Sequence, residues 1–282
     1  GVMFTNGTGT GKTYVGLGIA KRFHRQGKTN GIIIAPNDKI LADWQTSALN
    51  LNLSLKRLTD TQDNGGAGTV LTTYANYRAN KERVERDWDF VIFDEAHYLG
   101  QNKDGNDTSA LAMMRATTLH PRGAYSNHLV KNAEKIDEVS VLALEAARLN
   151  KQLRRTYDRD AKRPIREQYN AAEEKLQKAQ RELDQLREAA ESEFHAKLKA
   201  GKRKKVVFLS ATPFAYEKNV EYAEGYLFEY GQEPENRGGY GVPSAKDQFF
   251  ITNFGYRMRY GKLTKPDADV NTELMEQEFN AM

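Results

Sequence analysis

Short apolar runs alternate with longer amphipathic stretches along the first hundred residues, and one more apolar run follows after a long interval. Apolar runs bounded by Gly, Pro or polar residues are typical of buried strands, and apolar positions with a helical repeat are typical of helices. The predicted strands cover residues 2–5, 31–35, 53–58, 69–73, 89–93 and 205–210. The predicted helices cover residues 12–26, 38–49, 74–86 and 107–118. This alternation predicts an α/β fold, with a parallel sheet that helices cover on both faces.

Residues 131–200 have a different repeat, in which apolar positions are spaced alternately by four and three residues. Its second half contains Ile165, Tyr169, Ala172, Leu176, Ala179, Leu183, Leu186 and Ala190, and Phe194 and Leu198 continue the repeat after a one-residue shift. A matching stripe in the first half contains Val139, Leu142, Ala146, Leu149, Leu153 and Tyr157. Pro164 is expected to break the helix between the stripes, because proline removes a helical hydrogen bond. The pattern therefore predicts an inserted antiparallel coiled-coil hairpin over residues 131–200.

The sequence leaves two interpretations of this hairpin open. It is either a solvated arm that packs on itself or on the core, or an arm that contacts a protein or nucleic-acid partner. The basic run Lys202-Arg203-Lys204-Lys205 that follows is either a phosphate contact or a solvated exit from a helix into a strand.

The C-terminal part begins with a helical pattern at 216–230 and a Gly/Pro/Asn loop at 231–244. Aromatic residues alternate with arginine from Phe249 to Tyr260; they either stack on a nucleic-acid strand or form a core, and we favour the core. An acidic helix is predicted over residues 267–279. The expected domains are a discontinuous one at 1–130 and 201–235, the hairpin at 131–200, and the truncated start of a further region at 236–282.

A glycine-rich loop joins the first predicted strand to the first predicted helix. Its residues are Gly7, Thr8, Gly9, Thr10, Gly11, Lys12 and Thr13. Backbone N–H groups of such a loop surround phosphate oxygens, the lysine reaches the β- and γ-phosphates, and the hydroxyl after it is placed to ligate Mg²⁺. The strict pattern has glycine where Asn6 stands, but three glycines still supply flexible positions. The sequence therefore predicts a nucleotide-binding loop.

Acidic residues follow the strand predicted at 89–93. Asp94 and Glu95 come directly after its apolar run, and His97 lies two residues further on. Ligands bind at the carboxyl edge of parallel sheets, and hydrolysis of a Mg²⁺-nucleotide needs an acid that holds the metal and a base that orients water. Asp94 and Glu95 are candidates for these roles. The alternative is an ordinary strand end with solvated acids.

The strand predicted at 205–210 ends in Ser210-Ala211-Thr212-Pro213. Together with the glycine-rich loop and Asp94-Glu95-Ala96-His97, this segment resembles motifs I, II and III of superfamily 2 DEAH-box helicases and translocases, in the same order. Two further matches are less specific: residues 32–36 are similar to motif Ia, and residues 70–74 are similar to motif Ib. A weaker likeness over 209–226 is to strawberry-notch-like ATPases and to helicase modules of phage polyvalent proteins.

The resemblance implies a RecA-like P-loop NTPase domain that hydrolyses ATP with Mg²⁺ and acts on nucleic acid; DNA is favoured, and RNA stays open. It implies that Lys12 neutralises charge on the phosphates, that Thr13 and Asp94 hold Mg²⁺, and that Glu95 polarises the attacking water. It further implies coupling residues that link the γ-phosphate to domain closure, namely His97, Ser210 and Thr212. A plain structural cap is the alternative for His97.

Phosphate contacts on the nucleic-acid face are implied for Pro36, Thr72 and Thr73. Members of this superfamily carry a second RecA-like domain with an arginine finger, and nothing in residues 231–282 matches its motifs. We therefore expect a fragment of a longer protein that hydrolyses ATP weakly by itself, because such a finger contributes about 10³–10⁵ in rate.

Composition narrows the remaining possibilities only slightly. The 282 residues are 39% hydrophobic and 28% charged, with no cysteine, five histidines and a net charge of +4. These values exclude disulfides and thiolate metal sites, and a cytoplasmic location in a bacterial or phage-infected cell fits them.

Two other classes of function stay open: a nucleotide-gated scaffold that works through the hairpin, and another P-loop enzyme such as a kinase. The intact Lys12, Asp94 and Glu95 set argues against the first, and the strand ending at Ser210 argues against the second.

Overall fold

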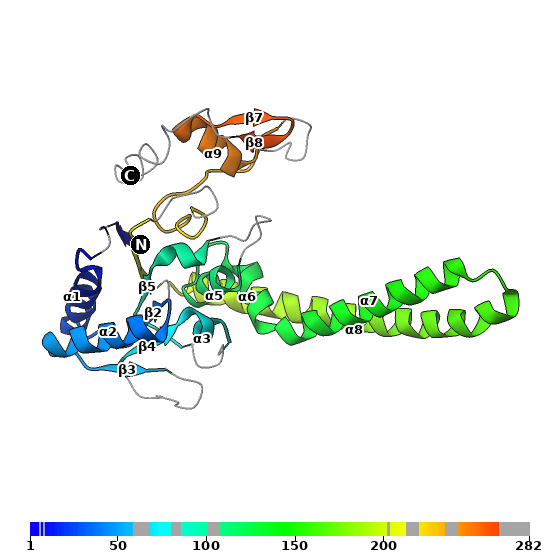
Figure 1. Cartoon of the computed structure of the whole chain (residues 1–282), viewed down its shortest axis with the longest axis horizontal. Coiled ribbons are helices and arrows are strands. Elements are labelled where there is room, and N and C mark those ends of the chain that lie inside the picture. Colours follow the sequence, from blue (N-terminus) through cyan, green and yellow to red (C-terminus); the bar gives the residue numbers. More distant parts are fainter. Residues whose placement is uncertain are drawn as a thin grey trace. The chain divides into compact units, whose positions relative to one another are not determined.

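The computed structural model of the chain describes residues 1–5, 7, 9–58, 68–79, 86–100, 108–201, 204–212, 220–234 and 242–264. These residues belong to two compact units, one made of residues 1–111 and 204–282 and the other of residues 112–203 (Figure 1). In the described part of the chain, no helix is both long and apolar enough to cross a membrane.

The first unit is built on a six-stranded sheet with the strand order β1-β6-β5-β2-β4-β3. Its strands are β1 (Val2–Phe4), β2 (Gly31–Ala35), β3 (Leu55–Arg57), β4 (Thr69–Thr73), β5 (Phe90–Asp94) and β6 (Lys205–Leu209). Every neighbouring pair is parallel, so all six carboxyl ends lie at one edge. The predicted α/β, RecA-like parallel sheet is confirmed.

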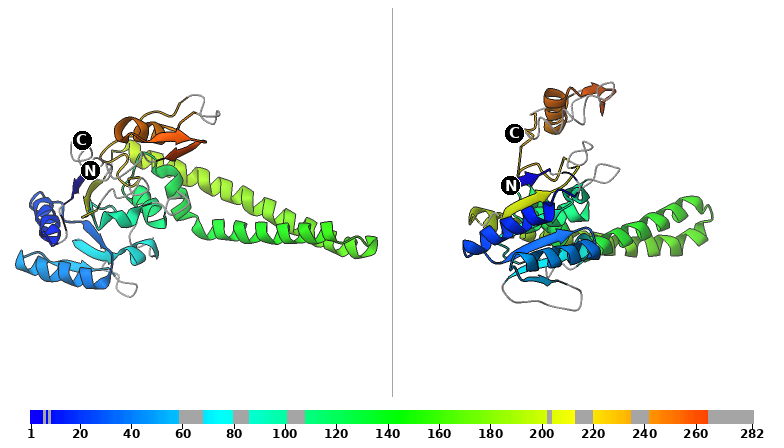
Figure 2. Two further views of the ribbon diagram at one scale, coloured as in Figure 1. Left: turned by 45° about the horizontal axis from the view of Figure 1, so that its top comes forward. Right: turned by 60° about the vertical axis from the view of Figure 1, so that its left-hand side comes forward.

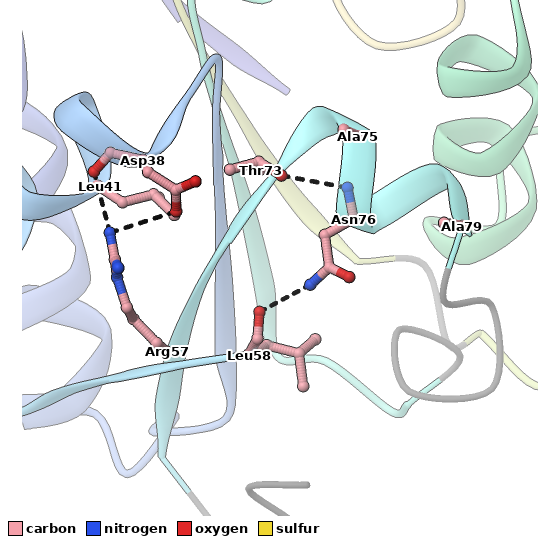
Figure 3. Close-up of a pocket in the computed structure, with 8 residues that line it drawn as sticks. All are labelled: Asp38, Leu41, Arg57, Leu58, Thr73, Ala75, Asn76 and Ala79. Carbon is pink, nitrogen blue, oxygen red and sulfur yellow. Dashed lines mark hydrogen bonds and ion pairs between the residues drawn. The ribbon is translucent and has the colours of Figure 1, made fainter. Parts of the chain in front are cut away.

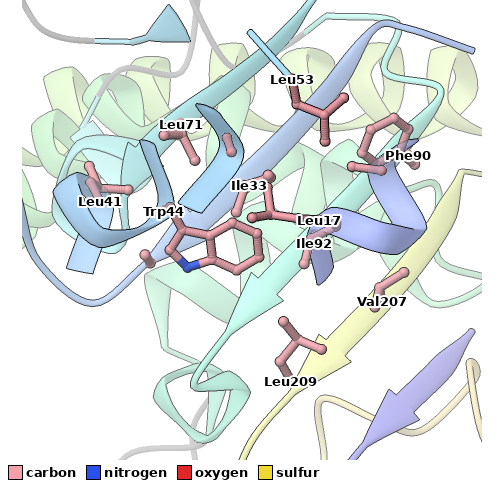
Figure 4. Packing of buried hydrophobic residues seen from close by; sticks show 13 residues of the cluster. Leu17, Ile33, Leu41, Trp44, Leu53, Leu71, Phe90, Ile92, Val207 and Leu209 are labelled. Carbon is pink, nitrogen blue, oxygen red and sulfur yellow. The ribbon is translucent and has the colours of Figure 1, made fainter. Parts of the chain in front are cut away.

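Helices cover both faces of this sheet. They are α1 (Lys12–Arg25), α2 (Asp38–Asn50) and α3 (Tyr74–Ala79). The 3₁₀ helix η1 (Ala96–Leu99) follows β5, and α5 (Ser109–Thr117) spans the point in the sequence where the first unit ends and the second begins. On one face, Ile92 of β5 packs with Leu17 of α1 and Trp44 of α2 (Figure 4). On the other face, the neighbouring Phe93 contacts the ring of Tyr77 in α3. Because side chains alternate along a strand, consecutive residues of β5 join the two helical layers to one sheet.

The second unit consists mainly of α6 (Gly123–Lys131), α7 (Ala133–Arg155) and α8 (Arg159–Lys199). Figure 2 shows α7 and α8 side by side in both views, joined by a short turn. Ala146, Leu149 and Ala172 form the buried seam between them, with Tyr169 and Leu176 packed against it. These five residues all belong to the predicted stripes, whereas Leu186 is 42% exposed and Tyr157 is 92% exposed.

The position of the break in the hairpin was predicted wrongly. The chain turns at residues 156–158, where Asp158 Oδ1 accepts a hydrogen bond of 2.9 Å from Asp160 N and caps α8. Pro164 lies inside α8. Its missing N–H leaves the carbonyl of Asp160 without its helical donor, but both residues are exposed and water can serve as the partner. An exposed proline near the start of a helix is therefore tolerated, and the cap decides where the helix begins.

The C-terminal part of the first unit contains α9 (Ala245–Phe254), β7 (Arg257–Arg259) and β8 (Lys262–Thr264). Four aromatic residues of this segment are buried in one cluster, as a core interpretation requires: Phe249, Phe250, Phe254 and Tyr256. The helix predicted at 216–230 is wrong for its described part, where residues 220–230 form turns and Gly225 has φ +77°. Residues 213–219, and the acidic helix predicted at 267–279, lie outside the described residues.

The basic run after the hairpin is described only from Lys204 onwards. Lys204 forms an ion pair with Asp87, just before β5, and its side chain is 10% exposed. This contact agrees with the interpretation of the run as an exit from a helix into a strand. Lys202 and Arg203 lie outside the described residues.

Candidate functional site

The glycine-rich loop has the backbone that a tight phosphate-binding turn needs. Gly9 and Gly11 have φ of +78° and +86°, in the left-handed region that residues with a Cβ rarely adopt. The turn is closed by Thr10, whose Oγ1 donates to the carbonyl oxygen of Gly7 at 2.6 Å. Thr8 lies outside the described residues.

The N-terminus of α1 faces this loop without a side-chain cap. Its N-cap residue is Gly11, no side-chain cap is found in the described residues, and the first turn contains no acidic residue. The first N–H groups of a helix have no partner within the helix, and the helix dipole favours an anion beside them. Lys12 and Thr13 belong to this first turn, so an ammonium group and a hydroxyl adjoin a place suited to phosphate.

Lys12, Glu95, His97 and Ser210 are connected in space although they come from three separate segments of the chain. Lys12 Nζ lies 3.5 Å from Glu95 Oε1, and Glu95 Oε2 lies 3.4 Å from His97 Nδ1. The same His97 nitrogen lies 3.2 Å from Ser210 Oγ. The structure therefore brings together residues from all three segments that carry the resemblance, with Glu95 and His97 of the second segment linking Lys12 to Ser210.

The Ser210 end of this group is fixed by the backbone. Ser210 N donates to the carbonyl oxygen of Phe4 at 3.1 Å, which ties the end of β6 to the strand that leads into the glycine-rich loop. Thr212 joins through its backbone, because its N–H donates to Ser210 Oγ at 3.3 Å. The Thr212 side chain is exposed.

Asp94 is held by three donors, of which Trp44 and Tyr74 were not revealed as site residues by the sequence. Trp44 Nε1 donates to Asp94 Oδ2 at 2.8 Å, and Glu95 N donates to Asp94 Oδ1 at 3.0 Å. The hydroxyl of Tyr74 donates to the Asp94 carbonyl oxygen at 3.0 Å. Burial raises the pKa of the Asp94 carboxyl above its ordinary value, and the hydrogen bond from Trp44 opposes that rise. Trp44 thus orients the Asp94 carboxylate and favours its charged form, while Tyr74 holds the backbone of the same residue.

The sequence contains one feature that could have identified Trp44 as a residue that contacts the site. It lies on the apolar face of the helix predicted at 38–49, and a buried indole N–H needs an acceptor. Its position depends on Gly16 of α1, where a Cβ would overlap the Trp44 ring. Without a side chain at Gly16, α1 and α2 approach closely enough for the indole to reach β5 (Figure 4).

The backbone at Glu95 separates the two neighbouring carboxylates. Glu95 has φ +49° and ψ +57°, a left-handed conformation that costs a residue with a Cβ about 1–2 kcal/mol. The turn lets Asp94 stay buried at 5% exposure, while the Glu95 side chain is 26% exposed beside Lys12. Strain of this kind at the end of a strand is common where side-chain direction matters for function.

The three residues expected on a nucleic-acid face have different surroundings. Thr73 lines a pocket of ≈ 350 Å³ at the ends of β3 and β4, together with Asp38, Leu41, Arg57, Leu58, Ala75, Asn76 and Ala79 (Figure 3). Thr72 is fully buried, and its Oγ1 accepts a hydrogen bond from Asn76 Nδ2 at 2.9 Å. Pro36 is half-buried and precedes Asn37, which caps α2 by accepting from Ile40 N at 3.1 Å.

Residues 1–120 match the family described as "Type III restriction enzyme, res subunit". The family consists of superfamily 2 helicase-like ATPase domains, and residues 1–120 are similar to them. A search among curated proteins finds no significant match. The matched segment of the helicase-like ATPase domain includes the glycine-rich loop and Asp94–His97, and it stops before β6 and the α7–α8 hairpin. The similarity to this NTPase family implies that the segment binds a nucleotide.

The oxygen atoms at this edge suit Mg²⁺, the ion that accompanies ATP. Mg²⁺ takes oxygen ligands and usually binds through one or two carboxylates together with substrate phosphates. Thr13 offers a hydroxyl, and each Asp94 oxygen retains a lone pair beyond its protein hydrogen bond. Among the described residues, no cluster of three or more His, Cys, Asp or Glu could hold a metal alone, so such an ion would depend on phosphate oxygens.

Proposed function

We propose that the chain contains the ATP-hydrolysing motor domain of a nucleic-acid-dependent ATPase of the helicase or translocase type. The observation that carries the proposal is the contact series from Lys12 through Glu95 and His97 to Ser210. In this series a candidate phosphate-binding cation, a candidate base and a candidate relay lie within contact distance at the carboxyl edge of the sheet, where ligands bind in parallel sheets.

In this proposal the ATP phosphates lie on residues 7–13 at the N-terminus of α1. Lys12 pairs with Glu95 at 3.5 Å. Phosphate oxygens would take over the Lys12 ammonium, which leaves the Glu95 carboxylate available to orient the attacking water. Thr13 and Asp94 would hold Mg²⁺, which neutralises charge on the phosphates. Trp44 would keep the Asp94 carboxylate turned toward that position.

The second part of the proposal concerns the link to nucleic acid. The His97 imidazole contacts both Glu95 and Ser210, and Ser210 Oγ accepts from the backbone N–H of Thr212. In the proposal, a movement of the Glu95 side chain on ATP binding therefore shifts His97, Ser210 and Thr212 in turn. We assign the coupling role to this route. The pocket beside Thr73 is the proposed phosphate contact for nucleic acid, with Thr72 supporting it through Asn76 and Pro36 shaping the start of α2.

ATP binding and turnover by the 282-residue chain test this proposal. We expect Lys12→Ala to weaken binding of a fluorescent ATP analogue by about 10- to 100-fold, because hydrogen bonds to charged groups contribute about 1.5–3 kcal/mol. Arg25→Ala, in the last turn of the same helix, removes an exposed cation away from the loop and should leave affinity unchanged.

Turnover is then measured with and without single-stranded DNA, duplex DNA and RNA. We expect slow hydrolysis that one of these polymers stimulates. Equal ATP affinity of Lys12→Ala and the unaltered chain would contradict the assignment of the loop. Tight ATP binding with no turnover on any polymer would instead favour the nucleotide-gated scaffold.

A further inference from the structure

Positive charge is concentrated where α7 turns into α8. We call residues 148–166 the hairpin tip, and its cations are Arg148, Lys151, Arg154, Arg155, Arg159, Lys162, Arg163 and Arg166. Its carboxylates are Asp158 and Asp160, so eight cations face two acids and the net charge is +6. The whole chain has a net charge of +4, which means that the rest of the chain is slightly acidic.

The remainder of the same hairpin has the opposite character. In residues 133–147 and 167–199, which we call the hairpin base, seven cations face twelve carboxylates. Three of its seven cations form ion pairs within the base: Lys135 lies 2.6 Å from Glu182, Arg187 lies 2.8 Å from Glu191, and Lys197 lies 2.6 Å from Glu193. The base therefore has a net negative charge, with seven cations against twelve carboxylates, and internal ion pairs neutralise part of it.

The cations of the tip are exposed and mostly without acidic partners. Seven of the eight are exposed, and Lys162 is half-buried. Among the described residues, Arg163 is the one tip cation in an ion pair, with Glu167 at 3.5 Å, and both side chains are largely exposed. Charges in this situation repel one another across the turn and interact chiefly with solvent and counterions.

Helix stability does not explain this arrangement. Arg154 and Arg155 lie in the last turn of α7, where the helix dipole favours positive charge. Arg159, Lys162 and Arg163, however, lie in the first two turns of α8, where the dipole disfavours it. A set of cations kept at an unfavourable helix end points to an anionic partner outside the chain.

We propose that the hairpin tip is a binding surface for the phosphodiester backbone of nucleic acid. A backbone carries regularly repeated negative charge, which matches several exposed cations spread over two helices better than one compact anion does. Lys151, Arg154 and Arg155 line an open depression of ≈ 370 Å³ on α7. Tyr157 in the turn is 92% exposed, so its ring is available to a base next to the bound phosphates.

An anionic membrane fits this surface less well. Binding to a lipid surface requires apolar side chains that enter the acyl region in addition to cations. Leu149 of the tip is buried at 4% exposure, and Leu153 and Ile165 are half-buried along the seam. The tip thus presents charge and one aromatic ring rather than an apolar face. The contact lies outside the ATP site and does not depend on ATP turnover.

A charge-matched pair of variants tests the proposal by fluorescence anisotropy with a labelled oligonucleotide, in the absence of ATP. The tip variant carries Arg155→Gln, Arg159→Gln, Arg163→Gln and Arg166→Gln. The base variant carries Lys175→Gln, Lys178→Gln, Arg181→Gln and Lys199→Gln, which remove the same charge from exposed positions of α8. Glutamine has a helix propensity close to that of lysine and arginine, so both variants should fold, and circular dichroism checks this.

We expect the tip variant to lose about 100-fold in affinity near 0.1 M salt. The slope of log affinity against log salt should fall by about 3, since each lost phosphate contact removes about 0.7–0.9. The base variant should change less than threefold. Equal losses in the two variants, or no loss in either, would overturn the proposal. So would binding of phosphatidylserine vesicles that depends on the tip when oligonucleotide binding does not.

The outcome is separable from that of the proposed ATPase activity. The tip variant should bind an ATP analogue as the unaltered chain does, and Lys12→Ala should keep the tip-dependent part of oligonucleotide binding. Because the chain has no cysteine, Tyr157→Cys and Ser192→Cys each provide one labelling position, in the tip and in the base. A dye at residue 157 should respond to oligonucleotide, and a dye at residue 192 should not; the reverse pattern would also contradict the proposal.

Discussion

The carboxyl edge of the sheet and the hairpin tip both gather charged residues, but they do so in opposite ways. At the edge, Lys12, Glu95 and His97 lie within 3.5 Å of their neighbours in the series, and Asp94 is 5% exposed with donors to both carboxylate oxygens. At the tip, eight cations share two acids, and one ion pair is formed within the described residues.

This difference decides what each region can do. Groups held by fixed neighbours away from water interact strongly, and their effect depends on geometry. Exposed charges act through their number and are screened by salt. We therefore expect single substitutions to have large effects at the edge, whereas effects at the tip should accumulate over several residues and fade at high salt.

Glu95→Gln should produce the largest effect and tests the chemical side of the comparison. The substitution keeps the shape of the side chain and removes its ability to accept a proton. We expect hydrolysis to fall by about 10²–10⁴, the usual contribution of a general base, with ATP affinity unchanged. Single-turnover hydrolysis of labelled ATP measures this. A variant that hydrolyses ATP at the unaltered rate would remove Glu95 from the chemistry, and with it the contrast between the two regions.

Trp44→Phe comes next and tests whether fixed neighbours matter at the edge. It removes the donor to Asp94 Oδ2 and leaves a buried carboxylate oxygen without that partner. We expect the free energy of unfolding to fall by about 1–3 kcal/mol, measured by urea denaturation. In an Asp94→Asn background the same substitution should cost less, because the acceptor is then uncharged. An equal cost in both backgrounds would assign the loss to packing alone.

The two regions also differ in how much of them the sequence predicts. The strands, the glycine-rich loop and the acidic pair are encoded by adjacent residues, so local pattern was sufficient for them. The contact between Trp44 and Asp94 was missed, because it depends on how closely α1 and α2 approach at Gly16. Such an approach joins residues far apart in the chain, which periodicity does not describe.

In the hairpin, the stripes predicted two helices correctly, but proline chemistry alone misplaced the turn. Asp158 caps α8 six residues before Pro164. The cap satisfies N–H groups at the start of the helix, whereas the carbonyl that proline orphans is exposed to water. The prediction of a helix at 216–230 was also wrong for a local backbone reason. Gly225, in the described part of this segment, adopts φ +77°, which a right-handed helix does not allow.

Tyr157→Ala tests the tip at a single residue and should have a smaller effect. If the ring stacks on a base, we expect affinity for a single-stranded oligonucleotide to fall by about 5- to 10-fold. Tyr157→Phe keeps the ring and should bind as the unaltered chain does. The loss should persist at high salt, unlike the losses caused by removing cations. If alanine and phenylalanine variants bind equally, the tip acts through charge alone.

The hairpin base gives the smallest effect and sharpens the comparison, because Glu193 is one of its charges that is exposed yet paired. Hydrogen bonds from Lys131 and Lys197 lower the pKa of Glu193 from 4.5 to about 2. A carboxyl with a lowered pKa stabilises the folded state fully above its unfolded pKa, so this contribution should disappear as the pH falls from 4.5 to about 2. Because the Glu193 side chain is 44% exposed, we expect it to contribute less than about 1 kcal/mol to the free energy of unfolding.

Thermal unfolding across this pH range should show a smaller acid-induced loss of stability for Glu193→Gln than for the unaltered chain, and no such difference for Glu188→Gln. Equal curves for all three would mean that the pairing of exposed charges does not stabilise this hairpin, and that the tip and the base differ in charge but not in the strength of their contacts.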